Sequence, residues 1–108
     1  MIDVQDFRAR ADDAIAHLHR RLMAAGDRYG FEADINGGAL AIEFDEPKAK
    51  FVVSPNAPVS QIWVSALSKS FKLDWDARRR EFALPGGPTL TELIARSAGE
   101  LLGEAVQL

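Results

Sequence analysis

The sequence has 108 residues, of which 47% are hydrophobic and 27% are charged, and this fits one globular domain with its own core. It contains no cysteine, which excludes disulfides, thiolate metal sites and a cysteine nucleophile. The formal net charge of -3 at pH 7 argues against bulk binding of nucleic acid.

The N-terminal residues are acidic and include no apolar run. They therefore look like neither a secretory signal nor a membrane-spanning helix. The absence of cysteine fits a reducing compartment. We expect no membrane association and a cytoplasmic protein of bacteria, or a mitochondrial matrix protein if the chain is a processed eukaryotic one.

The first predicted element is an amphipathic helix over residues 4–25. Asp3 is a suitable N-cap, and Gly26, which opens the stretch GDRYG, is expected to end the helix. The apolar residues recur at steps of three and four, as one buried helix face requires: Phe7, Ala11, Ala14, Ile15, Leu18 and Leu22.

From Phe31 onward the apolar residues alternate with polar ones, and this predicts β-strands. The segments FEADI, ALAIEFD, KFVVS, SQIWVSALS, FKLDW and REFAL each have one apolar face. NGG between the first two predicts a tight hairpin, in which Gly37 and Gly38 both need positive φ. EPKA, PNAP and DARR mark three further turns.

A second helix is predicted after the stretch PGGP. Thr89 and Glu92 form a capping box at its start, and Gly103 is a suitable C-terminal stop. Its apolar stripe has helical spacing and consists of Leu90, Leu93, Ile94, Ala98, Leu101 and Leu102.

The order of elements is thus one helix, five or six antiparallel strands in a meander, and one helix. Two helices cover only one face of such a sheet. We therefore predict an α+β fold: a two-layer sandwich formed by residues 1–108 as a single domain, with the other sheet face in water. Gln61, Trp63 and Ser65 should lie on that open face.

An outward-facing tryptophan on a central strand has two interpretations. Its ring can simply lie across neighbours such as Val52 or Lys72. Alternatively Trp63 is an anchor for a partner protein, because tryptophan is enriched among binding hot spots. The polar rim of that binding surface would consist of Gln61, Ser65, Ser54 and Asn56.

The motifs of common enzymes are absent from the sequence. No glycine pair is followed by the Lys-Ser/Thr of a phosphate loop. His17 and His19 point roughly 200° apart on one helix, so they cannot chelate one metal and are interpreted as solvated. The triplet Arg78–Arg80 at a hairpin tip is either a solvated turn or a small patch for contact with anions.

Carboxylates offer the remaining candidate chemistry, either as an ordinary acidic surface or as a weak oxygen-ligand site for a hard cation. Asp6, Asp12 and Asp13 lie on the first helix. Asp27 is expected in the loop that follows, and Glu32 and Asp34 share the open face of the first strand.

The segments DINGGALAIEF and PNAPVSQIWVSA, together with the element order, resemble the frataxin family. The later pair DW and the capped helix TLTELIARSAGELL are similar to that family as well. The resemblance covers essentially the whole chain. The hairpin and the QIW strand are its most specific marks.

The resemblance implies an accessory factor of iron–sulfur cluster assembly, not an enzyme. Such proteins bind the complex of cysteine desulfurase and scaffold protein, modulate sulfur transfer, and bind iron weakly through surface carboxylates. The family's exposed tryptophan and adjacent glutamine, which contact this machinery, match Trp63 and Gln61. Where the family often has Asn-x-Gln before them, this chain has Ser54, Pro55 and Asn56.

A second departure is in the acidic ridge that the family carries along the end of the first helix. The matching positions here are mostly not acidic: His19, Arg20, Met23, Ala24, Gly26, Arg28 and Gly30. We therefore expect only weak, salt-sensitive binding of iron or another divalent cation, at Glu32 and Asp34 in first place.

Three functions compete at this point. The first is a non-enzymatic, monomeric regulator of the cysteine desulfurase. The second is an iron carrier, an iron store or a ferroxidase, against which the depleted ridge counts. The third is a single-stranded nucleic-acid platform, since an open sheet with an exposed aromatic is one way to stack bases. A single outward aromatic and the acidic net charge argue against it.

Overall fold

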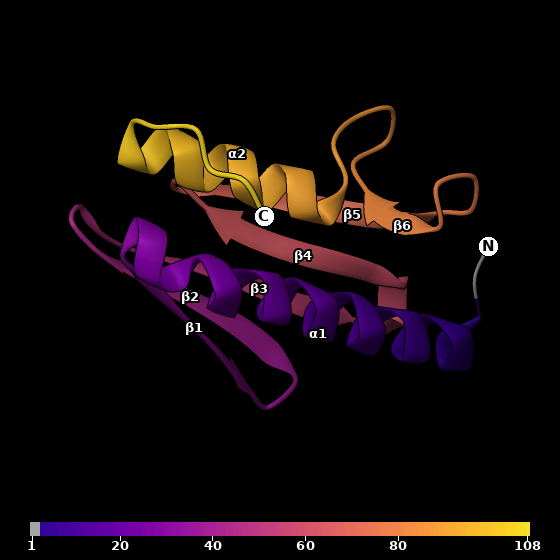
Figure 1. Ribbon diagram of the computed structural model, residues 1–108. Coiled ribbons are helices and arrows are strands. Elements are labelled where there is room, and N and C mark those ends of the chain that lie inside the picture. The colour runs from indigo at the N-terminus through magenta and orange to yellow at the C-terminus, as the bar shows by residue number, and fades with distance from the viewer. Residues whose placement is uncertain (1–2) are drawn as a thin grey trace.

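The computed structural model describes residues 3–108 and contains two helices and a six-stranded antiparallel sheet. In chain order the elements are α1 Val4–Tyr29, β1 Phe31–Asn36, β2 Ala39–Asp45, β3 Lys48–Asn56, the 3-10 turn η1 Ala57–Val59, β4 Gln61–Ala66, β5 Lys69–Asp76, β6 Glu81–Ala83 and α2 Leu90–Leu102. The strands form a meander in sequence order. The predicted two-layer α+β sandwich is confirmed (Figure 1).

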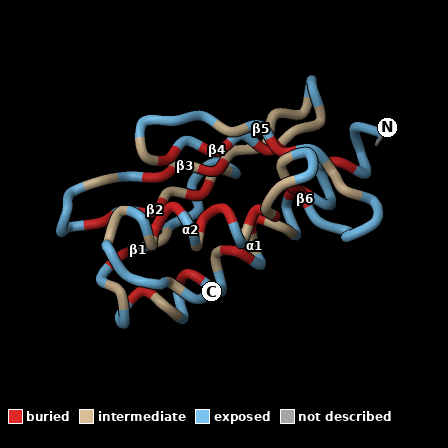
Figure 2. The backbone as a smooth tube through the Cα atoms, turned by 90° about the horizontal axis from the view of Figure 1, so that it is seen from above, coloured by how far each residue is buried: buried red, intermediate tan, exposed pale blue. Residues whose placement is uncertain are grey.

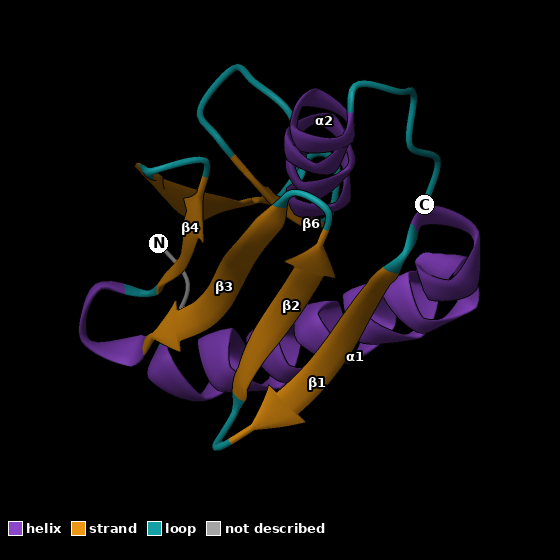
Figure 3. Cartoon of the chain, turned by 90° about the vertical axis from the view of Figure 1, so that its left-hand side faces the viewer, coloured by secondary structure: helices purple, strands orange, loops and turns teal. Residues whose placement is uncertain are grey.

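The core lies between the sheet and the two helices, which pack on the same face of the sheet (Figures 2 and 3). The inward alternate residues of the central strands are fully buried, as the period of two requires. Ile62 and Val64 of β4 are 0% and 1% exposed. The side chains between them, Gln61, Trp63 and Ser65, point to the open face, as predicted.

Helix α1 begins as predicted but ends later than residue 25. The carboxylate of Asp3 accepts a hydrogen bond from the backbone N–H of Asp6, which is an N-cap. The helix continues through Gly26 to Tyr29, and the left-handed cap is Gly30. Gly26 is therefore no stop signal: a Cβ there would lie 2.7 Å from the carbonyl oxygen of Phe31, so the glycine lets β1 pass close to the helix.

The NGG hairpin is confirmed. Gly37 and Gly38 have φ of 63° and 85° and connect β1 to β2 as a two-residue turn that pairs Asn36 with Ala39. Ile35, predicted to face the core, is 42% exposed. The end of this hairpin extends past α1 (Figure 1), so the inward face of β1 loses its cover there.

Several strand boundaries differ from the prediction, among them both ends of β3, which begins at Lys48 inside the predicted turn EPKA. Strand β3 extends through Pro55 and Asn56, which were expected in a turn, and the turn is formed by η1. The pairing of β3 with β2 ends at Val53, so Pro55 lies where the strand has only β4 beside it, and a missing N–H donor is tolerated there. Strand β4 ends at Ala66 instead of Ser68.

Helix α2 and its signals are as predicted. The Thr89 hydroxyl accepts from the Glu92 backbone N–H and the Glu92 carboxylate accepts from the Thr89 backbone N–H, at 3.3 and 2.9 Å. Gly103 caps the other end. These hydrogen bonds satisfy the free N–H groups of the first turn, and α2 follows β6 on the second edge of the sheet.

The C-terminal residues lie between the two helices (Figure 1). The guanidinium of Arg21 donates to the backbone carbonyl of Leu108 at 3.0 Å, and the backbone N–H of Gln107 donates to the Tyr29 hydroxyl at 3.2 Å. Val106 and Leu108 pack against the core. No periodic pattern marks these residues, so the sequence did not predict this contact. Among residues 3–108, no helix is long and apolar enough to cross a membrane.

The turn geometry predicts a specific sensitivity at Gly37. Gly37→Val should lower the free energy of unfolding by about 2 kcal/mol, because a β-branched residue is disfavoured at positive φ. A Cβ at this position has nothing within 4 Å, so a clash would not contribute. Gly37→Asn is the matched control, since asparagine tolerates this conformation. Equal stability of the two variants in chemical denaturation would refute the turn assignment.

The capping box predicts a pH-dependent stability. The hydrogen bond from the Thr89 backbone N–H, followed by that with the Thr89 side chain, lowers the pKa of Glu92 from its ordinary value of 4.5. Because this pKa is lowered on folding, the charged carboxylate stabilises the fold above pH 4.5. This contribution to the free energy of unfolding is lost as the pH falls through the folded-state pKa.

Glu92→Gln should therefore be less stable than the parent near neutral pH, and the difference should shrink as the pH falls below 4.5. The difference in thermal midpoint between the parent and Glu92→Gln, measured near neutral pH and again below pH 4.5, checks this. Glu100→Gln, on the same helix and without a described hydrogen bond among residues 3–108, is the control and should not reproduce this narrowing. A stability difference between Glu92→Gln and the parent that does not change with pH would contradict the capping role of the Glu92 carboxylate.

Candidate functional site

The open face of the sheet brings the five predicted partner-binding residues together on two neighbouring strands. Trp63 of β4 lies directly opposite Ser54 of β3, and Gln61 lies opposite Asn56. Ser65 is the next outward residue of β4. Paired outward residues on adjacent strands have Cβ atoms about 5 Å apart. The five residues therefore form one continuous surface, which we call the Trp63 face.

The Trp63 ring is held in place by its neighbours. Its indole N–H donates to the side-chain oxygen of Gln61 at 3.0 Å, and the Gln61 amide donates to a carboxylate oxygen of Asp74 at 3.1 Å. The ammonium of Lys72 lies 5.1 Å from the ring centroid, a cation–π contact. Trp63 as a whole residue remains 38% exposed, so its ring is oriented while the residue stays accessible.

These contacts bear on both interpretations of Trp63, local packing and partner binding. The cation–π contact with Lys72 is the local packing that the first interpretation predicts. It does not cover the ring, and the hydrogen bonds fix it in one orientation. A side chain already fixed in this way loses little rotamer entropy when a partner covers it. Asp74 belongs to this network, and sequence reasoning missed it although its outward position on β5 was predicted.

The candidate metal ligands are distributed over separate places. Asp6, Asp12 and Asp13 are exposed on the first half of α1, and Glu32 and Asp34 are exposed on the open face of β1. Asp27 lies within α1 and not in a loop, because the helix continues to Tyr29. Within residues 3–108, no three Asp, Glu or His side chains gather in the manner of a metal site.

The structure adds one carboxylate to the pair on β1. Glu32 lies directly opposite Glu43 of β2, and Glu43 lies opposite Lys50 of β3. Two like charges in such a pair repel each other, and a cation between them would relieve the repulsion. Lys50, on the far side of Glu43, opposes the approach of a cation.

The two histidines have different surroundings, and the interpretation of both as solvated is wrong for His19. Its ring nitrogen Nε2 lies 3.1 Å from the backbone carbonyl oxygen of Ala33. This contact joins α1 to the edge strand β1. His17 is exposed and borders a cleft between α1, β6 and α2. Helical periodicity alone contains no signal for the His19 contact, because its partner is on another element.

A family model with the description Frataxin-like domain matches residues 1–104 of this chain. The chain belongs to the frataxin family. The resemblance of the hairpin and of the QIW strand to this family is thereby confirmed, and it extends over nearly the whole sequence.

Relatives and solved structures agree with this assignment. The chain is 28% identical to the iron-sulfur cluster assembly protein CyaY of Azotobacter vinelandii, over 92% of each protein. It is 30% identical to that of Pseudomonas aeruginosa, over 92% of this chain and 94% of the relative. The frataxin of Psychromonas ingrahamii has the same fold, with a TM-score of 0.75, 19% identity and coverage of 98% and 97%. Yeast frataxin has a TM-score of 0.72 and 20% identity, over 92% of this chain and 82% of its own.

Proposed function

We propose that this chain is a non-enzymatic accessory protein of iron–sulfur cluster assembly that docks through the Trp63 face. The partner is the complex of cysteine desulfurase and scaffold protein, whose sulfur transfer it modulates. The observation that carries the proposal is the oriented, exposed indole of Trp63 on the open sheet face. The relatives named iron-sulfur cluster assembly protein support the pathway. A bacterial cytoplasmic monomer is the form in which we expect it to act.

The geometry of the face supports a protein partner better than a single-stranded nucleic acid. Base stacking along a strand needs several exposed aromatic rings. On the part of the sheet that the structure describes, Trp63 is the only exposed aromatic residue. Its polar neighbours, such as Ser54, Gln61 and Ser65, suit the rim of a protein interface.

The docking proposal predicts the effect of truncating the tryptophan. Trp63→Ala should keep the fold, because the ring leaves the open face and not the core. It should weaken binding to the desulfurase–scaffold complex by about 2 kcal/mol or more, which is about 30-fold in Kd. Val4→Ala is the control: Val4 is 50% exposed on α1, in the other layer, and its truncation should leave Kd unchanged.

Binding is measured by surface plasmon resonance with the reconstituted complex, and folding by the thermal midpoint. A collapse of the midpoint with unchanged affinity would make Trp63 a structural residue. A pull-down from lysate with the parent and the Trp63→Ala chain identifies the partner independently.

We also propose weak iron binding at the carboxylates of the first two strands. Neighbouring outward residues of one strand, such as Glu32 and Asp34, are about 7 Å apart, and Glu43 lies opposite Glu32. Hard cations need several converging oxygen ligands. Few carboxylates, in exposed positions, support weak binding that salt screens. An iron carrier or a ferroxidase would need a denser site than this.

Calorimetric titration with Fe2+ under anaerobic conditions should therefore detect weak binding that decreases with added salt. Glu32→Gln/Asp34→Asn should abolish it, whereas Asp12→Asn/Asp13→Asn, with the same change of charge on α1, should not. Tight binding of several irons at physiological salt would contradict the proposal. Binding that only the α1 variant loses would move the site to the early helix.

A further inference from the structure

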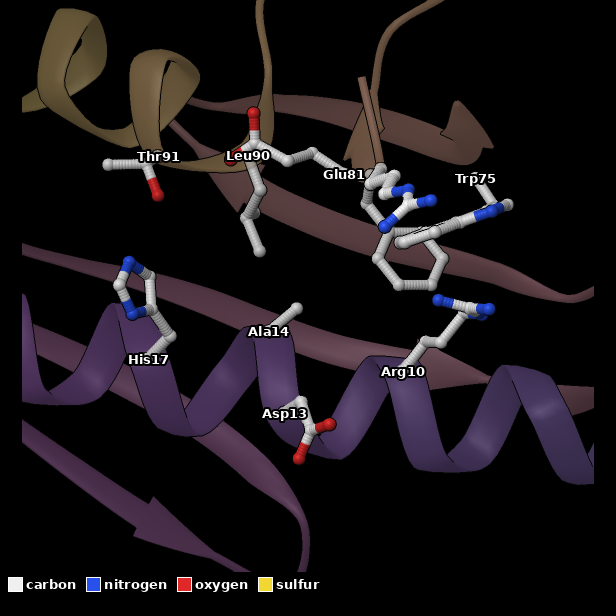
Figure 4. A pocket seen from close by; sticks show the side chains of 10 residues that line it. Arg10, Asp13, Ala14, His17, Trp75, Glu81, Leu90 and Thr91 are labelled. Carbon is white, nitrogen blue, oxygen red and sulfur yellow. The ribbon is translucent and has the colours of Figure 1, made fainter. Parts of the chain in front are cut away.

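A cleft of about 280 Å³ lies between the first half of α1, the β5–β6 hairpin and the start of α2 (Figure 4). It is separate from the Trp63 face, because Trp75 of β5 points to the helix side of the sheet, where it contacts Arg10 of α1. This volume is just below the range of about 300–1,000 Å³ that pockets for drug-sized ligands have, so the cleft has the size for a ligand of one ring or less. The floor and walls are apolar where Phe82, Leu90 and Ala14 border the cleft.

Two arginines at this cleft have no anionic partner within the described residues. Among residues 3–108, Arg79 and Asp76 form the only ion pair. Arg79 also donates a hydrogen bond to the backbone carbonyl of Gly87. Arg10 and Arg80 form none. The guanidinium of Arg10 lies 4.4 Å from the centroid of the Trp75 ring, a contact that leaves its N–H groups available.

The charges are unevenly distributed along the cleft. Arg10 and His17 rise from α1 toward the opposite wall, and Arg10 points to Trp75 (Figure 4). The carboxylate of Asp13 points away from that wall, and Glu81 extends toward Leu90 and Thr91 at the start of α2. Arg10 therefore presents a guanidinium group at the end of the cleft near Trp75, and Arg80 also lines the cleft. Guanidinium groups bind carboxylates and phosphates in bidentate fashion.

The backbone at Arg80 is an independent observation. Arg80 has φ of 54°, in the left-handed region where glycine or asparagine costs least. It is the last residue of the hairpin before β6. A strained non-glycine residue at a cleft points to a use for its side chain.

We propose that this cleft binds a small molecule that carries an oxyanion on an apolar body. The carboxylate or phosphate group lies between Arg10 and Arg80, and the apolar body lies on Phe82 and Leu90. This site goes beyond docking to the assembly machinery and does not depend on it. Glu81 lowers the affinity for anions, because its carboxylate borders the same cleft.

The test uses the full chain with Trp63→Phe, so that Trp75 is the only tryptophan and its fluorescence reports on the cleft. Benzoate and phenyl phosphate are the two probes, and their comparison separates carboxylate from phosphate. Both should cause a saturable change of emission. Benzyl alcohol, which lacks the charge, and inorganic phosphate, which lacks the ring, should bind at least about ten-fold more weakly.

Charge variants locate the binding. Arg10→Gln/Arg80→Gln should weaken the better probe at least about ten-fold, and Glu81→Gln should strengthen it. Arg8→Gln/Arg20→Gln is the matched control: it removes two exposed arginines of α1 that do not border the cleft. No saturable response to either probe, or equal losses in the two double variants, would overturn the proposal. It would also be overturned if an acidic peptide bound and both probes did not.

One further variant separates binding from folding. Arg80→Gly removes the side chain and relieves the backbone strain, so the thermal midpoint should be unchanged or raised while affinity falls. Ser68→Gly is its control, because Ser68 also has a positive φ, of 61°, but lies in the β4–β5 turn. It should keep the parent affinity. Arg80→Gly protein that binds the probe as tightly as the parent would refute the assigned role of Arg80.

Discussion

Two helices must cover a sheet of six strands in this fold, and both pack on one face of it. Inward residues such as Ile62 and Val64 are therefore excluded from water, and their burial drives folding. Outward residues meet solvent whatever their type. Trp63 is consequently stabilised by side chains of its own face and remains available to a partner. The backbone hydrogen bonds between the strands hold this surface in one arrangement.

The network around Trp63 also limits which partners can cover it. Because the indole N–H is already bonded to Gln61, a partner gains mainly from burying the ring. Covering the ring also removes water from the ammonium of Lys72, which is costly unless an acceptor replaces the water. The complementary surface should therefore combine an apolar patch for Trp63 with a carboxylate or carbonyl group for Lys72.

Sequence reasoning reached the elements whose signals are local. The caps at Asp3 and Thr89, the turn at Gly37 and the alternation of the strands need only neighbouring residues. Features that depend on a distant segment were missed or misread. Gly26 is a glycine inside the helix because β1 passes close beside it, and Pro55 stays in β3 because β2 has already ended. Likewise, the alternation of side chains along a strand predicts which residues share the open face. It does not predict the hydrogen bond from Gln61 to Asp74, because that bond joins two strands.

Strand β4, which carries Trp63, is turned at both ends by residues in the left-handed region that are not glycine. Ser60 precedes it with φ of 52°, and Leu67 and Ser68 follow with 54° and 61°. Such positions cost about 1–2 kcal/mol each, so the pairing on both sides of β4 must stabilise them. Short turns of fixed geometry also fix the register of a strand. A slip of one residue would bury Trp63 and expose Ile62 and Val64. The strained turns therefore hold the tryptophan on the open face.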